Sequence, residues 1–151
     1  MRIAIRWVWA LALVVGVVAT LAGGRPALAG ADTEELAQAL LQFEQNVRWR
    51  AVSDQWRGAR DGWVGEVQSA SSPAVLSRQV MVLEDAMGWD SVEASWRQQR
   101  PGWVAMMQSA RTDGVVARGM LELEEATLWS AVRQEWRGLR DDWVARVKAV
   151  R

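Results

Sequence analysis

The residues best suited to acid–base chemistry in this sequence are adjacent carboxylates. They form four pairs: Glu34–Glu35, Glu84–Asp85, Glu124–Glu125 and Asp141–Asp142. Neighbouring side chains on a helix point in different directions, so such a pair does not face one substrate as acid and base. The chain also has no His and no Cys, which excludes Ser-His-Asp and Cys-His catalysis, disulfides, zinc held by His or Cys, and haem on a proximal His. We therefore expect no catalytic residues and no enzyme.

Cofactor and metal sites are equally unsupported by the sequence. It contains no Gly-rich phosphate loop. Several Met side chains could ligate a soft metal, but they occupy apolar positions of a repeating pattern, where packing explains them better. They are Met81, Met87, Met106, Met107 and Met120. We expect no cofactor and no bound metal.

The first 29 residues have the pattern of a secretory signal. Arg2 and Arg6 precede an apolar run over residues 7–24, and residues 27–29 read Ala-Leu-Ala. A basic start, an apolar stretch and a small-residue cleavage pattern are typical of exported proteins. We expect cleavage after Ala29 and a mature protein in the periplasm, the cell envelope or the extracellular space. The alternative is an uncleaved membrane anchor, because an apolar run of 18 residues just spans a bilayer.

The mature chain would carry a small negative charge. Cleavage removes three arginines and no acid, which leaves residues 30–151 with a net charge of −3. A chain of this charge and destination is not expected to bind nucleic acid. A membrane surface stays open as a partner, because Trp and Arg together favour bilayer interfaces.

Written in blocks of forty, residues 32–151 form a threefold repeat without gaps. Eight columns carry one residue type throughout: Trp49/Trp89/Trp129, Trp56/Trp96/Trp136, Trp63/Trp103/Trp143, Glu44/Glu84/Glu124, Val52/Val92/Val132, Arg57/Arg97/Arg137, Arg60/Arg100/Arg140 and Val64/Val104/Val144. A period near forty indicates stacked supersecondary units, each of which needs its neighbours to bury its apolar face. We expect units at about 32–71, 72–111 and 112–151 in one domain over residues 30–151.

Each unit is predicted to form two helices. The first would begin at a column of good N-cap residues, Asp32, Ser72 and Thr112, and continues with apolar residues at helical spacing. The chain turns near the Trp49 column, and a second helix carries the other two Trp columns on one face. Pro101 falls inside that second helix, so we expect a kink or a break there.

The Trp columns are predicted to build the core. Nine rings of about 200 Å² each exceed any apolar patch that a soluble monomer exposes. We place six of them inside: Trp56, Trp63, Trp96, Trp103, Trp136 and Trp143. The other three, Trp49, Trp89 and Trp129, lie at the turns, where a ring either shields the turn or stands exposed as a contact for a partner or ligand.

The Glu44 column is predicted to pair with the Arg57 column. With a turn at Trp49 and a rise of 1.5 Å per residue, Glu44 lies about 7.5 Å and Arg57 about 12 Å from the turn, a difference that an Arg side chain covers. We therefore expect three ion pairs, Glu44–Arg57, Glu84–Arg97 and Glu124–Arg137, with the Arg60 column reaching a neighbouring unit. The alternative is an arginine row that holds an anion or an acidic partner.

These features predict an all-α fold of three tandem helical hairpins, a short α-solenoid, with a compact six-helix bundle as the alternative. In a solenoid the last helix has no further unit to cover it, so its outer face would be open and would need cover from its own chain, a second copy or another protein. We therefore expect an exported, non-enzymatic interaction or structural module that self-associates or docks a protein partner. The alternatives are a Trp-based binder of cell-wall glycan or an apolar molecule, and a membrane-surface protein.

N-terminal sequencing of the protein recovered from an exporting bacterial host tests the signal. Processing after Ala29 predicts a mature N-terminus at Gly30. Material that still begins at Met1 would contradict cleavage and support the membrane anchor.

Overall fold

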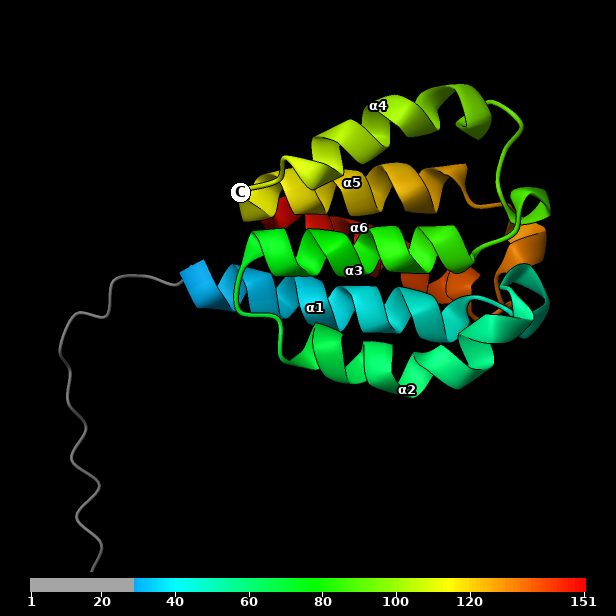
Figure 1. Cartoon of the computed structure of the whole chain (residues 1–151), viewed down its shortest axis with the longest axis horizontal. Helices are drawn as coiled ribbons and strands as arrows, with labels where there is room; N and C mark the ends of the chain where they lie inside the picture. Colours follow the sequence, from blue (N-terminus) through cyan, green and yellow to red (C-terminus); the bar gives the residue numbers. More distant parts are fainter. Residues whose placement is uncertain (1–28) are drawn as a thin grey trace, which may run out of the picture.

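The structure, a computed structural model, describes residues 29–151 and is all-α. Six α-helices and three short 3-10 helices account for its regular structure, and no β-strand occurs in the described range (Figure 1). The α-helices are α1 (Ala29–Asn46), α2 (Asp54–Gln68), α3 (Pro73–Ala86), α4 (Trp96–Gln108), α5 (Asp113–Ala126) and α6 (Trp136–Ala149); the 3-10 helices are η1 (Trp49–Ala51), η2 (Trp89–Ser91) and η3 (Trp129–Ala131). Among these helices, none is long and apolar enough to cross a membrane.

Each forty-residue unit folds as one hairpin: an inner helix, a 3-10 turn at the Trp49 column and an outer helix. The all-α fold expected from the sequence is confirmed. Residues 1–28 of the predicted signal lie outside the described residues, so export and cleavage stay predictions.

The three hairpins close into a ring. The inner helices α1, α3 and α5 all pack against one another, and each outer helix packs against its own inner helix and the next one. Thus α2 contacts α1 and α3, α4 contacts α3 and α5, and α6 contacts α5 and α1. In Figure 1, α1, α3 and α5 lie side by side, with α2 and α4 on opposite flanks. The last unit therefore packs on the first as each of the others packs on its successor.

Main-chain pairing at the turns follows the same circular order. Three isolated antiparallel bridges link Val52 with Met87, Val92 with Thr127, and Val132 with Val47. Each bridge is flanked by two backbone hydrogen bonds of 2.7–2.9 Å, for example from Gly88 N to Ala51 O at 2.9 Å and from Arg48 N to Ala131 O at 2.8 Å. The turns are thus joined to one another as well as to their own helices, which fixes the rotation between units.

The expected open face on the last unit is wrong. The indole of Trp143 on α6 donates from Nε1 to the carbonyl of Ala39 on α1, at 2.7 Å, and Arg146 pairs with Glu35 at 2.9 Å. Sequence columns show that units are alike but not the angle between them, and here that angle brings the third unit back to the first. The three units keep the forty-residue repeat of helical hairpins, and α6 of the third unit contacts α1 of the first.

Two local expectations also change. The first helix begins at Ala29, so Asp32 lies inside its first turn and does not cap it, whereas the Ser72 side chain accepts from Val75 N as expected. Thr112 occupies the N-cap position of α5 without a side-chain cap bond. Of the kink or break expected at Pro101, the break is wrong, because α4 continues through this residue. Because proline has no N–H, the carbonyl of Arg97, four residues earlier in α4, loses its usual helical donor.

A glycine allows α5 to approach α4. A side-chain carbon on Gly119 would lie 2.1 Å from the sulfur of Met107, and Met107 is fully buried. At the equivalent positions of α6 and α1, the repeat has Val147 and Ala39. The larger Met107 and the missing side chain of Gly119 therefore compensate each other.

Substituting Gly119→Ala should lower the free energy of unfolding by about 1–3 kcal/mol, because the new methyl group overlaps the Met107 side chain. The double variant M107V/G119A restores the combination found between the third and first units and should recover most of that loss. Urea unfolding of both variants measures the difference. A double variant no more stable than G119A would show that the overlap with Met107 is not the cause.

Candidate functional site

The six tryptophans predicted for the core are buried, with at most 4% of any side chain exposed. Within each outer helix the two rings meet edge to face, with centroids 5.1–5.5 Å apart. The second ring of each pair also donates its indole N–H to a main-chain carbonyl of the next unit: Trp63 to Gln79, Trp103 to Gly119 and Trp143 to Ala39, at 2.7–3.0 Å. These tryptophans are part of the architecture and are not available to a ligand.

A buried glutamate organises the space beneath each turn. Glu44 is 5% exposed and accepts from Trp56 Nε1 at 3.3 Å and from the Arg60 guanidinium at 2.6 and 2.8 Å. Glu84 is held in the same way by Trp96 and Arg100, and Glu124 by Trp136 and Arg140. Each carboxylate therefore has a neutral donor and a charged donor on the outer helix of its own unit.

The partner of this glutamate differs from the one expected. Arg60, Arg100 and Arg140 form the ion pairs, and Arg57, Arg97 and Arg137 do not. Trp56 and Arg60 are four residues apart on α2, so both side chains reach Glu44 from one face, while Arg57 points about 100° away from Trp56. The connection from α1 to α2 is a 3-10 turn between extended residues, which sets α2 differently from the sharp hairpin assumed at Trp49.

The tryptophans of the turns are exposed and carry arginine over their rings. Trp49, Trp89 and Trp129 are 44%, 50% and 50% exposed. The guanidinium carbons of Arg57, Arg97 and Arg137 lie 5.1–5.8 Å from the respective ring centroids, and those of Arg60, Arg100 and Arg140 lie 5.9–6.0 Å away. These are cation–π distances. Each exposed ring is therefore held by the same arginine that neutralises the buried glutamate.

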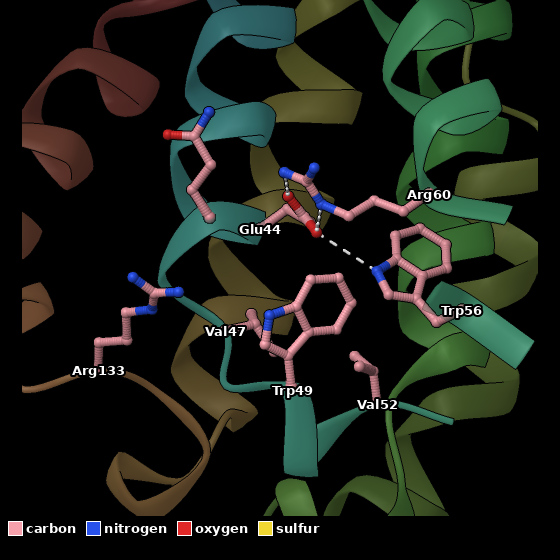
Figure 2. Close-up of a pocket in the computed structure, with 8 residues that line it drawn as sticks. Glu44, Val47, Trp49, Val52, Trp56, Arg60 and Arg133 are labelled. Carbon is pink, nitrogen blue, oxygen red and sulfur yellow. Dashed lines mark hydrogen bonds and ion pairs between the residues drawn. The ribbon is translucent and has the colours of Figure 1, made fainter. Parts of the chain in front are cut away.

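Each of these rings borders a cleft at the turn end of its unit. The first cleft has a volume of about 340 Å³ and is lined by Glu44, Trp49, Trp56, Arg60 and Arg133 among others. Figure 2 shows Trp49 standing between Val47 and Val52, below the Glu44–Arg60 pair, with Arg133 of the third unit on the opposite side. The equivalent clefts beside Trp89 and Trp129 measure about 220 and 190 Å³. The three define what we call the Trp–Arg clefts.

The arginines of the buried pairs are firmly charged. The hydrogen bond from Arg60 to Glu44 raises the pKa of that guanidinium, and partial burial opposes the shift. Glu84 and Glu124 raise the pKa of Arg100 and Arg140 in the same way. A raised folded-state pKa stabilises the fold at every pH below the ordinary value for arginine and loses effect only beyond it. The charge of these arginines therefore does not change near neutral pH, and the stability that it provides is not lost there.

The geometry gives no support to acid–base catalysis at the clefts. Glu44, Glu84 and Glu124 each pair with an arginine, and Asp85 contacts the same Arg100 as Glu84. Within residues 29–151, no group of three or more carboxylates is placed to hold a metal ion. The clefts offer an aromatic edge and a guanidinium, which are groups for contact.

A further hollow lies at the turn end of the molecule, the end that carries the three 3-10 turns, and the sequence did not predict it. It measures about 290 Å³ and is lined by the three turns: Arg50, Ala51, Asp90, Ser91, Ser130 and Ala131. Its exposed column carries three different residue types, so it is not one of the identical columns of the repeat. One feature of the sequence could have indicated this hollow: its exposed column directly follows the column of exposed Trp residues.

Residues 32–88 match a family described as Domain of unknown function (DUF8799). That segment covers the first hairpin and the inner helix of the second. No curated protein and no solved structure matches the chain.

Replacing Glu84 by Ala should lower the free energy of unfolding by about 2–3 kcal/mol, because the Trp96 indole and the Arg100 guanidinium both lose a buried acceptor. The matched control is Glu122→Ala on α5, whose carboxylate pairs only with the largely exposed Arg118 and should cost at most about 0.5 kcal/mol. Thermal and urea unfolding compare the two. Equal losses would show that the Glu84 contacts contribute no more than a surface pair.

Proposed function

We propose that this protein is an exported, non-enzymatic interaction module that docks a partner protein at the three Trp–Arg clefts. The observation that carries the proposal is the set of three half-exposed Trp side chains, each beneath an exposed arginine. The closed arrangement of the three hairpins holds them at one end of the molecule. The export part of the proposal is supported by the signal pattern of the first 29 residues.

The exposed rings favour docking on energetic grounds. Half of a Trp surface is about 100 Å², so covering one ring would contribute roughly 2.5 kcal/mol. The fold buries the other six Trp side chains of the described residues. The exposure of these three is therefore a specific feature of the turns. Trp and Arg are also the side chains most enriched among residues that dominate binding energy.

The arginine over each ring indicates the chemistry of the partner. Arg57, Arg97 and Arg137 are exposed and form no ion pair in the described chain. Each is oriented by its Trp ring, so little side-chain entropy is lost when it meets a carboxylate. We therefore propose that acidic side chains of the partner bind here. Three equivalent sites on one rigid ring allow a partner with repeated acidic segments to bind more tightly than one site would.

A small sugar is a weaker candidate than a protein. Saccharide binding on Trp needs a free ring face, and two guanidinium groups already lie over each exposed ring. Saturable binding of a cell-wall glycan that is lost with the three Trp rings would nevertheless overturn this preference.

Photo-cross-linking in the native compartment tests the proposal. A photo-reactive side chain at Trp49, Trp89 or Trp129 should give a discrete protein adduct, and the same group at the exposed Glu66 or Arg78 on the far halves of α2 and α3 should not. The adduct should weaken at least tenfold in the triple variant R57A/R97A/R137A. This variant should still unfold cooperatively above the assay temperature, because these arginines form no ion pair and each exposed contact with Trp contributes only about 0.5–1 kcal/mol. The absence of an adduct, or equal adducts at the control positions, would contradict docking at the clefts.

A further inference from the structure

The hollow at the turn end of the molecule is built from three equivalent turns that carry different side chains. Arg50, Asp90 and Ser130 occupy the same position of the repeat and all three are exposed. Arg50 donates to the main-chain oxygen of Ser130 at 2.9 Å, and neither Arg50 nor Asp90 forms an ion pair within the described residues. One face therefore presents a cation, an anion and a neutral hydroxyl around the ring axis.

The charge difference extends over the whole turn of each unit. Between the inner helix and the first Trp of the outer helix, residues 47–55 carry a net charge of +1, residues 87–95 a net charge of −2, and residues 127–135 none. The contributing side chains are Arg48, Arg50, Asp54, Asp90, Glu93, Arg133 and Glu135. The turn end is thus positive on the first unit, negative on the second and neutral on the third.

Such a face is complementary to itself. When two copies meet by the same surface they are related by a twofold axis, so that if one residue contacts a second, the second contacts the first. On a threefold ring that axis can pass through any one unit. Through the third unit it exchanges the first and second, so Arg50 meets Asp90 of the other copy twice. Through the first or second unit it sets like charges against each other, which disfavours those arrangements.

We propose that the turn end is an interface between two copies of this chain, with their ring axes aligned and Arg50 of each copy paired with Asp90 of the other. The proposal goes beyond the docking function, because it uses the axial hollow and leaves the arginines of the Trp–Arg clefts out of the pairing. The interface is polar and charged, so the dimer is weak and dissociates as salt is raised.

Charge reversal tests the pairing. The full chain is produced in an exporting bacterial host and sized by sedimentation velocity at low and high salt. The wild-type protein should dimerise at low salt, whereas R50D and D90R should each be monomeric, with a dissociation constant at least tenfold higher, because each then faces like charges. An equimolar mixture of R50D and D90R should form a heterodimer, and the double variant R50D/D90R should regain the homodimer.

Arg78→Asp and Glu66→Arg are the matched controls, since both reverse an exposed charge away from the turn end and should leave the dimer unchanged. A wild-type protein that stays monomeric up to about 1 mM at low salt would overturn the proposal, as would single variants that dimerise like wild type or a mixture that fails to associate. None of these results depends on cross-linking at Trp49, Trp89 or Trp129, so this inference and the docking function can fail separately.

Discussion

Closure of the ring is the constraint on which the other features depend. Three hairpins that each need a neighbour to cover their apolar face have no exposed end, because α6 packs on α1 and the Trp143 indole donates to Ala39. A chain with no disulfide thereby places most apolar side chains of residues 30–151 in one continuous core. Closure also fixes the three turns at one end of the molecule, linked by three antiparallel bridges.

The same closure makes the contact surface rigid. Each exposed Trp is held at a turn whose backbone bonds to the next turn. Of the two arginines near its ring, the one in the Arg60 column is anchored on a buried glutamate. A binding surface prepared in this way loses little conformational entropy on association. The two surfaces that we propose for contact, the Trp–Arg clefts and the axial hollow, both belong to the turns. The outer helices serve mainly to seal the core with Trp pairs.

The sequence predicts the parts of this fold that depend on residue type and spacing. Trp56 and Trp63 are seven residues apart and share one face of the second helix. Because a soluble monomer cannot expose nine Trp rings, the burial of these two follows from residue type together with spacing. The arrangement of the turn could not be predicted. The 3-10 segment and its extended flanking residues determine which arginine meets Glu44, and their dihedral angles cannot be read from the residue types at the Arg57 and Arg60 columns. Closure was not predictable for a similar reason: a repeat gives the likeness of units, whereas the angle between them arises from many small contacts such as that of Gly119 with Met107.

Ring closure is tested most directly by comparing three equivalent substitutions, Trp63→Phe, Trp103→Phe and Trp143→Phe. Each removes an indole N–H that bonds to the main chain of the next unit and leaves a smaller ring, so a closed ring predicts three similar losses in the free energy of unfolding, about 2–3 kcal/mol each. Urea unfolding measures them side by side. A loss for Trp143→Phe far below the other two would mean that the third unit does not pack on the first, and would contradict the closed ring.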